Sequence, residues 1–290
     1  MQVLRAMLFL AGTVLFSTRA LTYQEEDSLD SPGVCSSMYP PKSPHAPPLK
    51  DAKPIFYLHV PKCGTSFEIP LAKYACPNVP DVRRHMNELN ELCPGSFSRF
   101  RFGHQPLSKL AQQGEAGHVV LMMRPPLNRI VSGYLHNFHD CMQMQARYGV
   151  DDHGPLRNPM RDEDDVLLEY AHCVKGCVAR MLTGEWCDGD KGKHRSASVQ
   201  TKQAMEALQV LESVTFVGMT ESWNESMCLF EAMFGGNFTS SAFKNIRRTA
   251  LTGRDWVEVL ERNGFKDWAD ELLFNKARSM FLGWKSQYFA

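Results

Sequence analysis

An excess of charge of one sign is the first thing that this sequence lacks. Lys and Arg together number 32, as do Asp and Glu, so the formal net charge is zero at pH 7 with histidine neutral. Proteins that bind nucleic acid usually carry a basic field or a basic stripe. The balance therefore predicts no nucleic-acid partner, and an anionic ligand would have to be held by local groups of basic side chains.

Long hydrophobic runs are missing as well. Near the start of the chain, Arg5 is followed by an uncharged stretch over residues 6–18 and then by the small residue Ala20. This stretch is too short to cross a bilayer, since a membrane-spanning helix needs roughly 20 apolar residues. We interpret residues 1–20 as a cleaved signal peptide, with a short uncleaved signal anchor as the alternative. Either would deliver the rest to the lumen of the secretory pathway, and only the anchor would hold it to a membrane.

A third absence concerns phosphate-binding loops. No Gly-x-x-x-x-Gly-Lys segment occurs, the loop that cradles the phosphates of nucleoside triphosphates. This argues against a phosphotransferase of the P-loop kinase type, which has a suitable fold class and stays open only as the less favoured alternative.

Cysteine, by contrast, is plentiful, because the chain has nine. In the oxidising lumen, disulfides are the expected state of cysteine, and metal sites built from cysteine are less common. We expect Cys76 to pair with Cys93. We also expect two pairs, of open connectivity, among four further cysteines: Cys141, Cys173, Cys177 and Cys187.

Because the cysteine count is odd, at least one thiol is unpaired or forms a disulfide with another molecule. The best candidates are Cys63, which lies in a predicted turn, and Cys228, which lies in an apolar helical pattern. Two glycosylation sequons, at Asn224 and Asn237, fit the same lumenal compartment.

The composition divides the chain into a stem and one folded domain. Residues 21–53 are rich in Ser, Pro and acidic residues, and the proline-rich segment 40–48 does not suit a packed element. We interpret residues 21–53 as a stem or linker. Residues 54–290 are long enough to bury a sizeable core and are interpreted as one domain.

The pattern within that domain predicts the α/β class. Short apolar runs predict β-strands at three places: Ile55–Val60, Val119–Met123 and Val214–Val217. Apolar residues at helical spacing predict five helices: one after Arg124, with its apolar face running to Phe138, and others over 165–182, 201–212, 222–234 and 266–281. Strands separated by helices predict a central parallel sheet flanked by helices.

The first candidate binding segment is Pro61–Phe67, which follows the first predicted strand. Gly64 would let the backbone approach an anion without a Cβ in the way, and Lys62 would supply a positive charge. Thr65 and Ser66 would supply hydroxyl donors. A strand, such a turn and a helix N-terminus together can hold a phosphate, whereas the alternative is a plain strand-to-helix turn with an exposed lysine.

The second candidate segment repeats this plan with an arginine. Arg124 ends the second predicted strand, and the prolines 125 and 126 suit the start of a helix. Ser132 follows within that helix. Two separate phosphate-binding segments predict a nucleotide that carries phosphates on both sides of its ribose.

The two segments resemble those of the sulfotransferases that use 3′-phosphoadenosine 5′-phosphosulfate (PAPS). Residues 61–67 resemble the 5′-phosphosulfate loop of that family, and the segment from Arg124 to Ser132 resembles its 3′-phosphate motif. The likeness covers about residues 54–140. It implies a P-loop-like central parallel sheet, the sulfotransferase fold, with PAPS as sulfate donor and an enzyme of the lumenal, Golgi carbohydrate type.

The resemblance also implies a role for each matching residue. Lys62 would touch the oxygen between phosphate and sulfate and stabilise charge as the phosphate leaves. The rest of the loop would bind the 5′-phosphate: Cys63, Gly64, Thr65, Ser66 and Phe67. Arg124 and Ser132 would hold the 3′-phosphate. Cys63 departs from the Ser or Thr usual in the family, and because a thiol is a weak donor only its backbone N–H is expected to contribute.

Transfer of a sulfuryl group to a hydroxyl also needs a base. His104 lies in Arg101-Phe-Gly-His-Gln105, which resembles the Gly-His segment that supplies the base of Golgi glycosaminoglycan sulfotransferases. His59 is its rival, and we interpret it as a histidine hydrogen-bonded under the sheet edge. The favoured acceptor is a sugar hydroxyl of a glycan, and a non-catalytic lumenal protein that binds the nucleotide or a glycan is the alternative.

No metal is required by this interpretation, since Lys62, Arg124 and the loop amides can neutralise the phosphates. His136 and His139, with Asp140 and Cys141, could suggest a metal site, but at the end of an amphipathic helix we expect them to be solvated. Basic clusters that could hold an acidic glycan are more typical of solvated surface: Arg99 with Arg101, 191–195 and 244–248.

Overall fold

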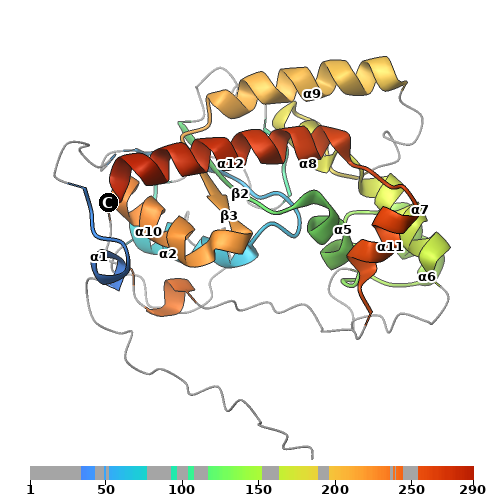
Figure 1. The fold of residues 1–290 in the computed structure, drawn as a ribbon, viewed down its shortest axis with the longest axis horizontal. Helices are drawn as coiled ribbons and strands as arrows, with labels where there is room; N and C mark the ends of the chain where they lie inside the picture. Colours follow the sequence, from blue (N-terminus) through green and yellow to red (C-terminus); the bar gives the residue numbers. More distant parts are fainter. Residues whose placement is uncertain are drawn as a thin grey trace, which may run out of the picture.

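The computed structural model describes a subset of the chain, shown in Figure 1 with the rest in grey: residues 34–42, 49, 52–76, 93–96, 104–107, 117–151, 163–188, 196–235, 238, 240–243 and 254–290. The predicted signal segment 1–20 lies outside the described residues. So do most of the stem, Asn237 and all three basic clusters. Within the described part, none of the helices combines the length and the hydropathy needed to cross a membrane.

A three-stranded parallel sheet forms the centre of the fold. Its strands are β1 (Ile55–Leu58), β2 (His118–Met123) and β3 (Phe216–Met219), in the order β1-β2-β3. The register places Leu58 opposite Leu121, and Leu121 opposite Val217. Nearly every strand residue is buried and apolar, the pattern of a parallel sheet that is covered on both faces. The predicted α/β architecture is thus confirmed at this level.

Helices cover the sheet. Helix α10 (Trp223–Phe234) and helix α12 (Trp268–Tyr288) both pack against β3, and α2 (Glu68–Ala75) follows the loop after β1. Helix α9 (Ala197–Glu212) lies beside α12, and both pack against α8 (Cys177–Leu182) (Figure 1). The core between them is dense in aromatic rings, such as those of Phe67, Phe216 and Phe230.

A second group of helices has a core of its own. It contains α5 (Pro126–Tyr134), α6 (Met142–Tyr148), α7 (Asp164–Val174) and α11 (Trp256–Arg262), which gather at one end of the molecule in Figure 1. Their apolar faces meet around Tyr134, Phe138 and Tyr170. Helix α5 therefore joins the two parts, because it starts at the end of β2 and packs on α7 and α11.

The predicted strands are all present, and two of the predicted helices need correction. The helix expected over 165–182 is two helices, α7 and α8, because Gly176 adopts a left-handed φ of 69° between them. Helix α5 ends at Tyr134 and not near Phe138, which itself has a φ of 54°.

The described part of the predicted stem is folded against the domain. A short helix α1 (Val34–Met38) carries Cys35, which forms a disulfide with Cys228 on α10. Pro41 forms a bridge with Phe289. The prediction that Cys228 is unpaired is therefore wrong, and residues 34–42 are not a free linker.

The other cysteine predictions are confirmed. Cys76 pairs with Cys93, and the open connectivity resolves into Cys141–Cys173 and Cys177–Cys187. Cys63 is the free cysteine, and it is buried.

Candidate functional site

The turn after β1 has an unusual backbone. Lys62 and Gly64 both adopt left-handed conformations, with φ of 63° and 78°. Gly64 does so without strain, whereas Lys62 has a Cβ and does so at a steric cost. A short 3₁₀ helix (Thr65–Phe67) then leads directly into α2, and the N–H of Phe67 donates to the carbonyl oxygen of Gly64 at 2.9 Å. The result is a tight loop at the N-terminal end of a helix.

The second predicted segment has the expected shape. Arg124 directly follows β2, Pro126 opens α5, and Ser132 lies on the second turn of that helix with 3% of its surface exposed. Because β1 and β2 are adjacent and parallel, both segments emerge at the same edge of the sheet.

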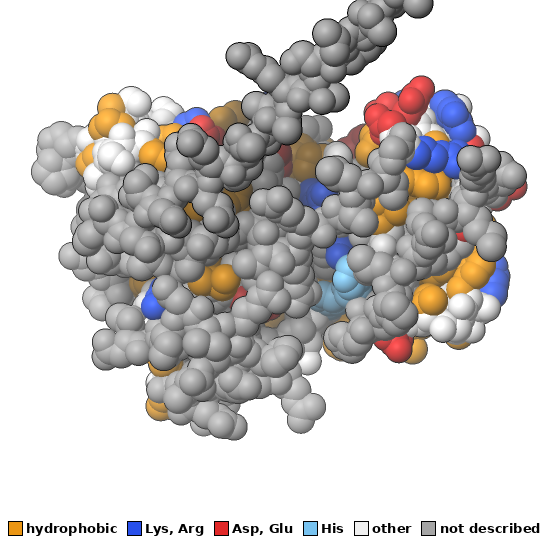
Figure 2. Space-filling view, turned by 90° about the horizontal axis from the view of Figure 1, so that it is seen from below, with side chains coloured by type: hydrophobic (Ala, Val, Ile, Leu, Met, Phe, Trp, Pro, Cys, Tyr) orange, Lys and Arg blue, Asp and Glu red, His pale blue; other side chains and the backbone are white. Residues whose placement is uncertain are grey.

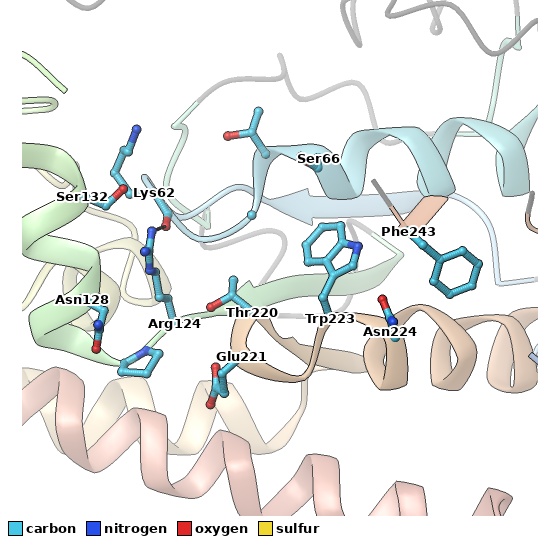
Figure 3. A pocket seen from close by; sticks show the side chains of 13 residues that line it. Lys62, Ser66, Arg124, Asn128, Ser132, Thr220, Glu221, Trp223, Asn224 and Phe243 are labelled. Atoms are coloured by element: carbon cyan, nitrogen blue, oxygen red, sulfur yellow. Dashed lines mark hydrogen bonds between the residues drawn. The ribbon is translucent and has the colours of Figure 1, made fainter. Parts of the chain in front are cut away.

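The two segments line one pocket of about 500 Å³. The guanidinium Nη1 of Arg124 donates to the backbone carbonyl oxygen of Lys62 at 3.4 Å, drawn as a dashed line in Figure 3. Of the predicted nucleotide-binding residues, six line this pocket: Lys62, Gly64, Thr65, Ser66, Arg124 and Ser132.

Two predicted binding residues face elsewhere. Cys63 is 1% exposed, and its backbone N–H donates to the carbonyl oxygen of Val60, so the amide that we expected to reach a phosphate is used inside the turn. Phe67 is fully buried against Phe216 and Phe230. Both residues are buried beneath the loop, and neither lines the pocket, contrary to what the sequence led us to expect.

The pocket has a second wall that the motifs did not reveal. It is built by the end of β3 and the start of α10, and it contributes Thr220, Glu221, Trp223 and Asn224, with Phe243 from the short helix Ser240–Phe243. Asn128, on α5, lines the pocket on the side of Arg124 (Figure 3). In Figure 3 the rings of Trp223 and Phe243 lie on the side of the pocket opposite Arg124. The indole N–H of Trp223 donates to the carbonyl oxygen of Ala242 at 3.0 Å, which fixes the ring. A local signal for this wall is the segment Phe216–Glu221, which runs through β3 into Thr220 and Glu221.

Burial shifts the pKa values of ionisable side chains around the pocket. Burial lowers the pKa of Arg124, although a guanidinium stays charged at neutral pH. Burial also raises the pKa of the Cys63 thiol to about 12, with Arg129 and Arg124 opposing the shift, so this side chain stays neutral. Burial raises the pKa of Glu221 as well. The pocket therefore presents the fixed positive charge of Arg124 and the ammonium of Lys62 beside hydroxyls and the carboxyl group of Glu221.

His104 lies in a separate cluster of ionisable side chains next to the loop. Its Nδ1 is 3.1 Å from Oδ1 and 2.9 Å from Oδ2 of Asp140, and its Nε2 is 3.4 Å from Nε2 of His139. The ring of His59 meets the ring of His104 edge to face at 4.8 Å between centroids. In Figure 2 histidine side chains are gathered beside basic side chains on the face seen from below.

His59 connects this cluster to the pocket. It is 6% exposed, and its Nε2 is 3.2 Å from the hydroxyl of Thr65, while its Nδ1 is 3.8 Å from Glu68. This geometry agrees with the interpretation of His59 as a buried, hydrogen-bonded histidine. Because Thr65 lines the pocket, the ring of His59 lies between His104 and a residue of the pocket wall.

The expectation that His139 and Asp140 are solvated is wrong. Their side chains are only 11% and 17% exposed, because the chain turns back after α5 and brings them against His104. Ligand atoms of His104, His139 and Asp140 lie within 4.8 Å of one another, a spacing that a metal ion also accepts.

Comparisons with known proteins do not assign the chain to a family. No family model matches it, and no curated protein matches it. The chemistry of the site is therefore derived from its residues.

Proposed function

We propose that the protein is a lumenal PAPS-dependent sulfotransferase that transfers a sulfuryl group to a hydroxyl of a glycan. The observation that carries this proposal is that Lys62 and Arg124 meet in one pocket, joined by a hydrogen bond of 3.4 Å. Each belongs to one of the two predicted phosphate-binding segments, and a nucleotide with 3′ and 5′ phosphates needs both. The three-stranded parallel sheet with helices on its faces is compatible with the sulfotransferase fold.

The residues present fit adenosine 3′,5′-bisphosphate, the part of PAPS that stays behind after transfer. The volume of about 500 Å³ lies within the range of nucleotide-sized ligand pockets. Lys62, Thr65 and Ser66 would hold the 5′-phosphate, and Arg124 and Ser132 the 3′-phosphate. The aromatic wall of Trp223 and Phe243 offers a surface for a base.

The proposed transfer uses two groups of this chain, His104 and Lys62. The acceptor hydroxyl oxygen attacks sulfur, the bond from sulfur to the 5′-phosphate oxygen breaks, and the hydroxyl proton passes to His104. Lys62 neutralises the charge that develops on the departing phosphate oxygen. The products are the sulfate ester, adenosine 3′,5′-bisphosphate and a protonated His104, which returns its proton to water.

The compartment supports the same proposal. Four disulfides are the state expected of cysteine in the secretory lumen. Residence in the Golgi follows from the carbohydrate type of enzyme that is proposed. PAPS is the donor there, and no metal is assigned to the transfer.

The direct test is transfer of ³⁵S from labelled PAPS to a panel of sulfate-free glycans. We expect transfer by the wild-type protein and its loss in Lys62→Ala, His104→Ala and Arg124→Ala. Matched controls are exposed residues of the same types, Lys202→Ala, His172→Ala and Arg147→Ala, which should keep wild-type activity. Full activity in all three site variants would refute the assignment.

Ligand binding separates the alternatives. Adenosine 3′,5′-bisphosphate should raise the melting temperature of the protein, and ATP with Mg²⁺ should not. Stabilisation by ATP alone would favour a phosphotransferase. Tight bisphosphate binding without transfer to any acceptor would favour the non-catalytic binding protein.

A further inference from the structure

The turn that follows α5 holds three non-glycine residues in left-handed conformations. Asn137, Phe138 and Asp140 have φ of 56°, 54° and 59°. A side chain makes this backbone region unfavourable, and a glycine would enter it freely. Such residues persist only where the surrounding structure enforces them, and they concentrate at functional sites. The chain keeps Asp140 where glycine would relieve the strain.

The surroundings do enforce this turn. Asn137 is fully buried, and its Nδ2 donates to the carbonyl oxygen of Asp151 at 2.9 Å. Phe138 is fully buried in the core of the second helix group. Cys141, the residue after Asp140, is joined to α7 by its disulfide with Cys173.

A tyrosine secures the middle of the turn. The hydroxyl of Tyr170, on α7, donates to the carbonyl oxygen of His139 at 2.7 Å. This approach needs Gly133, because a Cβ at that position would lie 2.0 Å from the Tyr170 hydroxyl oxygen. The backbone on both sides of the Asp140 side chain is therefore fixed.

The fixed turn places the carboxylate of Asp140 in contact with His104. Both carboxylate oxygens lie within 3.1 Å of His104 Nδ1. A carboxylate at Nδ1 holds the proton on that nitrogen and leaves Nε2 with the lone pair that accepts a proton. It also stabilises the imidazolium that forms when Nε2 is protonated.

His139 contacts both partners. Its Nε2 is 3.3 Å from Asp140 Oδ2 and 3.4 Å from His104 Nε2. One N–H cannot serve both, and the contact that meets hydrogen-bond geometry is the one with His104 Nε2. An acceptor hydroxyl would therefore take the place of His139 at His104 Nε2, while the contact of Asp140 with Nδ1 stays in place.

We propose that Asp140 is a positioning residue that sets the tautomer and the orientation of His104, and that the strained turn at 137–140 exists to place it. The role of His104 as base rests on the proposed function; the tautomer and the strain do not.

The test compares Asp140→Asn, Asp140→Glu and Asp140→Gly with wild type, and Glu261→Gln, an exposed carboxylate on α11, is the control. We expect Asp140→Asn to lower kcat about a hundredfold, within the range that a positioned base contributes. The KM for PAPS and the affinity for the bisphosphate should stay within about twofold, because the pocket lies outside the turn. Asp140→Glu should recover part of the loss.

Two measurements need no turnover, the tautomer of His104 and the melting temperature. In ¹⁵N-histidine NMR spectra, His104 should carry its proton on Nδ1 in the wild type and lose that preference in Asp140→Asn. Asp140→Gly should raise the melting temperature while it lowers kcat, since glycine removes strain and carboxylate together. A purely structural Asp140 would lose stability and activity together.

The experiments distinguish a failure of the proposed function from a failure of the positioning role of Asp140. If the wild type binds the bisphosphate but transfers no sulfate, the proposed function fails while the NMR and melting data still decide the role of Asp140. An unchanged His104 tautomer in Asp140→Asn, or wild-type kcat in that variant, overturns the positioning role. Loss of wild-type activity with EDTA, restored by Zn²⁺, overturns it as well, because the same three side chains would then be metal ligands.

Discussion

The guanidinium of Arg124 donates to the backbone carbonyl oxygen of Lys62, although 62 residues separate them in the sequence. This contact fixes the relative position of the two segments that the sequence identified separately. It follows from the sheet, because β1 and β2 are neighbours and their loops start at the same edge. The distance between the two proposed phosphate sites is therefore set by strand spacing.

The first prediction uses this pairing to separate the two phosphates of the ligand. Arg124→Ala should weaken binding of adenosine 3′,5′-bisphosphate by about 1.5–3 kcal/mol, the value of hydrogen bonds to a charged group. Binding of adenosine 5′-monophosphate, which has no 3′-phosphate, should change much less. Titration calorimetry of both ligands measures the difference, and Arg147→Ala, an exposed arginine on α6, should behave like the wild type. Equal losses for both ligands would place Arg124 elsewhere than at the 3′-phosphate.

The second prediction concerns the backbone of the loop. Gly64 has a φ of 78°, and a Cβ there would lie 3.0 Å from the Trp223 ring and 3.4 Å from Thr220. Gly64→Ala should therefore cost about 1–2 kcal/mol of stability from the backbone conformation alone, and it should push the aromatic wall away from the loop. We expect weaker bisphosphate binding and a lower melting temperature.

Gly283→Ala is the matched control for that change. Gly283 lies in α12, and nothing lies within 4 Å of a Cβ built on it. Alanine favours a helix over glycine by about 1 kcal/mol, so this variant should be as stable as the wild type or more stable, with normal ligand binding. If Gly64→Ala behaved in the same way, the left-handed loop would not be needed for binding.

Sequence alone could predict the sheet and one half of the pocket, for a physical reason. A buried parallel strand is a short apolar run, and its loop follows it directly, so both signals are local. The position of Trp223 on the opposite wall could not be predicted, because β3 brings it there by pairing with a strand almost 100 residues earlier in the chain. The partner of Cys228 was missed for the same reason, since Cys35 lies 193 residues away.

The histidine cluster could also be predicted only in part from the sequence. His104 was identified from its local segment, whereas Asp140 looked like the polar end of an amphipathic helix. The contact between them spans 36 residues and depends on the left-handed turn that ends the helix early. A run of non-glycine residues in that conformation leaves no signature in composition or periodicity.

The third prediction concerns the free thiol. Burial raises the pKa of Cys63 to about 12, so the thiolate that reacts with alkylating reagents is scarce at pH 8. Native protein should not react with iodoacetamide at that pH. After unfolding without reductant, one thiol per chain should react, because the other eight cysteines are paired.

Mass spectrometry of the labelled protein gives the count directly. Three labels after unfolding would mean that one of the four disulfides is absent. Cys63→Ser should lose the label and keep bisphosphate affinity within a few-fold, since the Cys63 side chain does not line the pocket. A large loss of affinity in that variant would show that the thiol shapes the loop more strongly than its burial indicates.

The last prediction concerns stability and pH. Arg129, on α5, is 2% exposed and lies 3.1 Å from Asp270 and 3.5 Å from Asp267, two buried carboxylates at the start of α12. Burial and the neighbouring Asp270 raise the pKa of Asp267 from 3.8 to about 7, while Arg129 and the N–H of Gly176 oppose the shift. One guanidinium does not offset both carboxylates.

The folded protein therefore binds a proton at Asp267 more tightly than the unfolded chain does. This contribution to stability is complete below pH 3.8 and is lost as the pH rises through about 7. Asp267→Asn keeps an N-cap for α12 but cannot titrate, so it should lack this pH-dependent contribution to the free energy of unfolding. Urea unfolding from pH 5 to pH 8 should show the wild type losing stability relative to Asp267→Asn as the pH rises. Glu206→Gln, an exposed change on α9, should follow the wild type, and parallel curves for the wild type and Asp267→Asn would contradict the raised pKa.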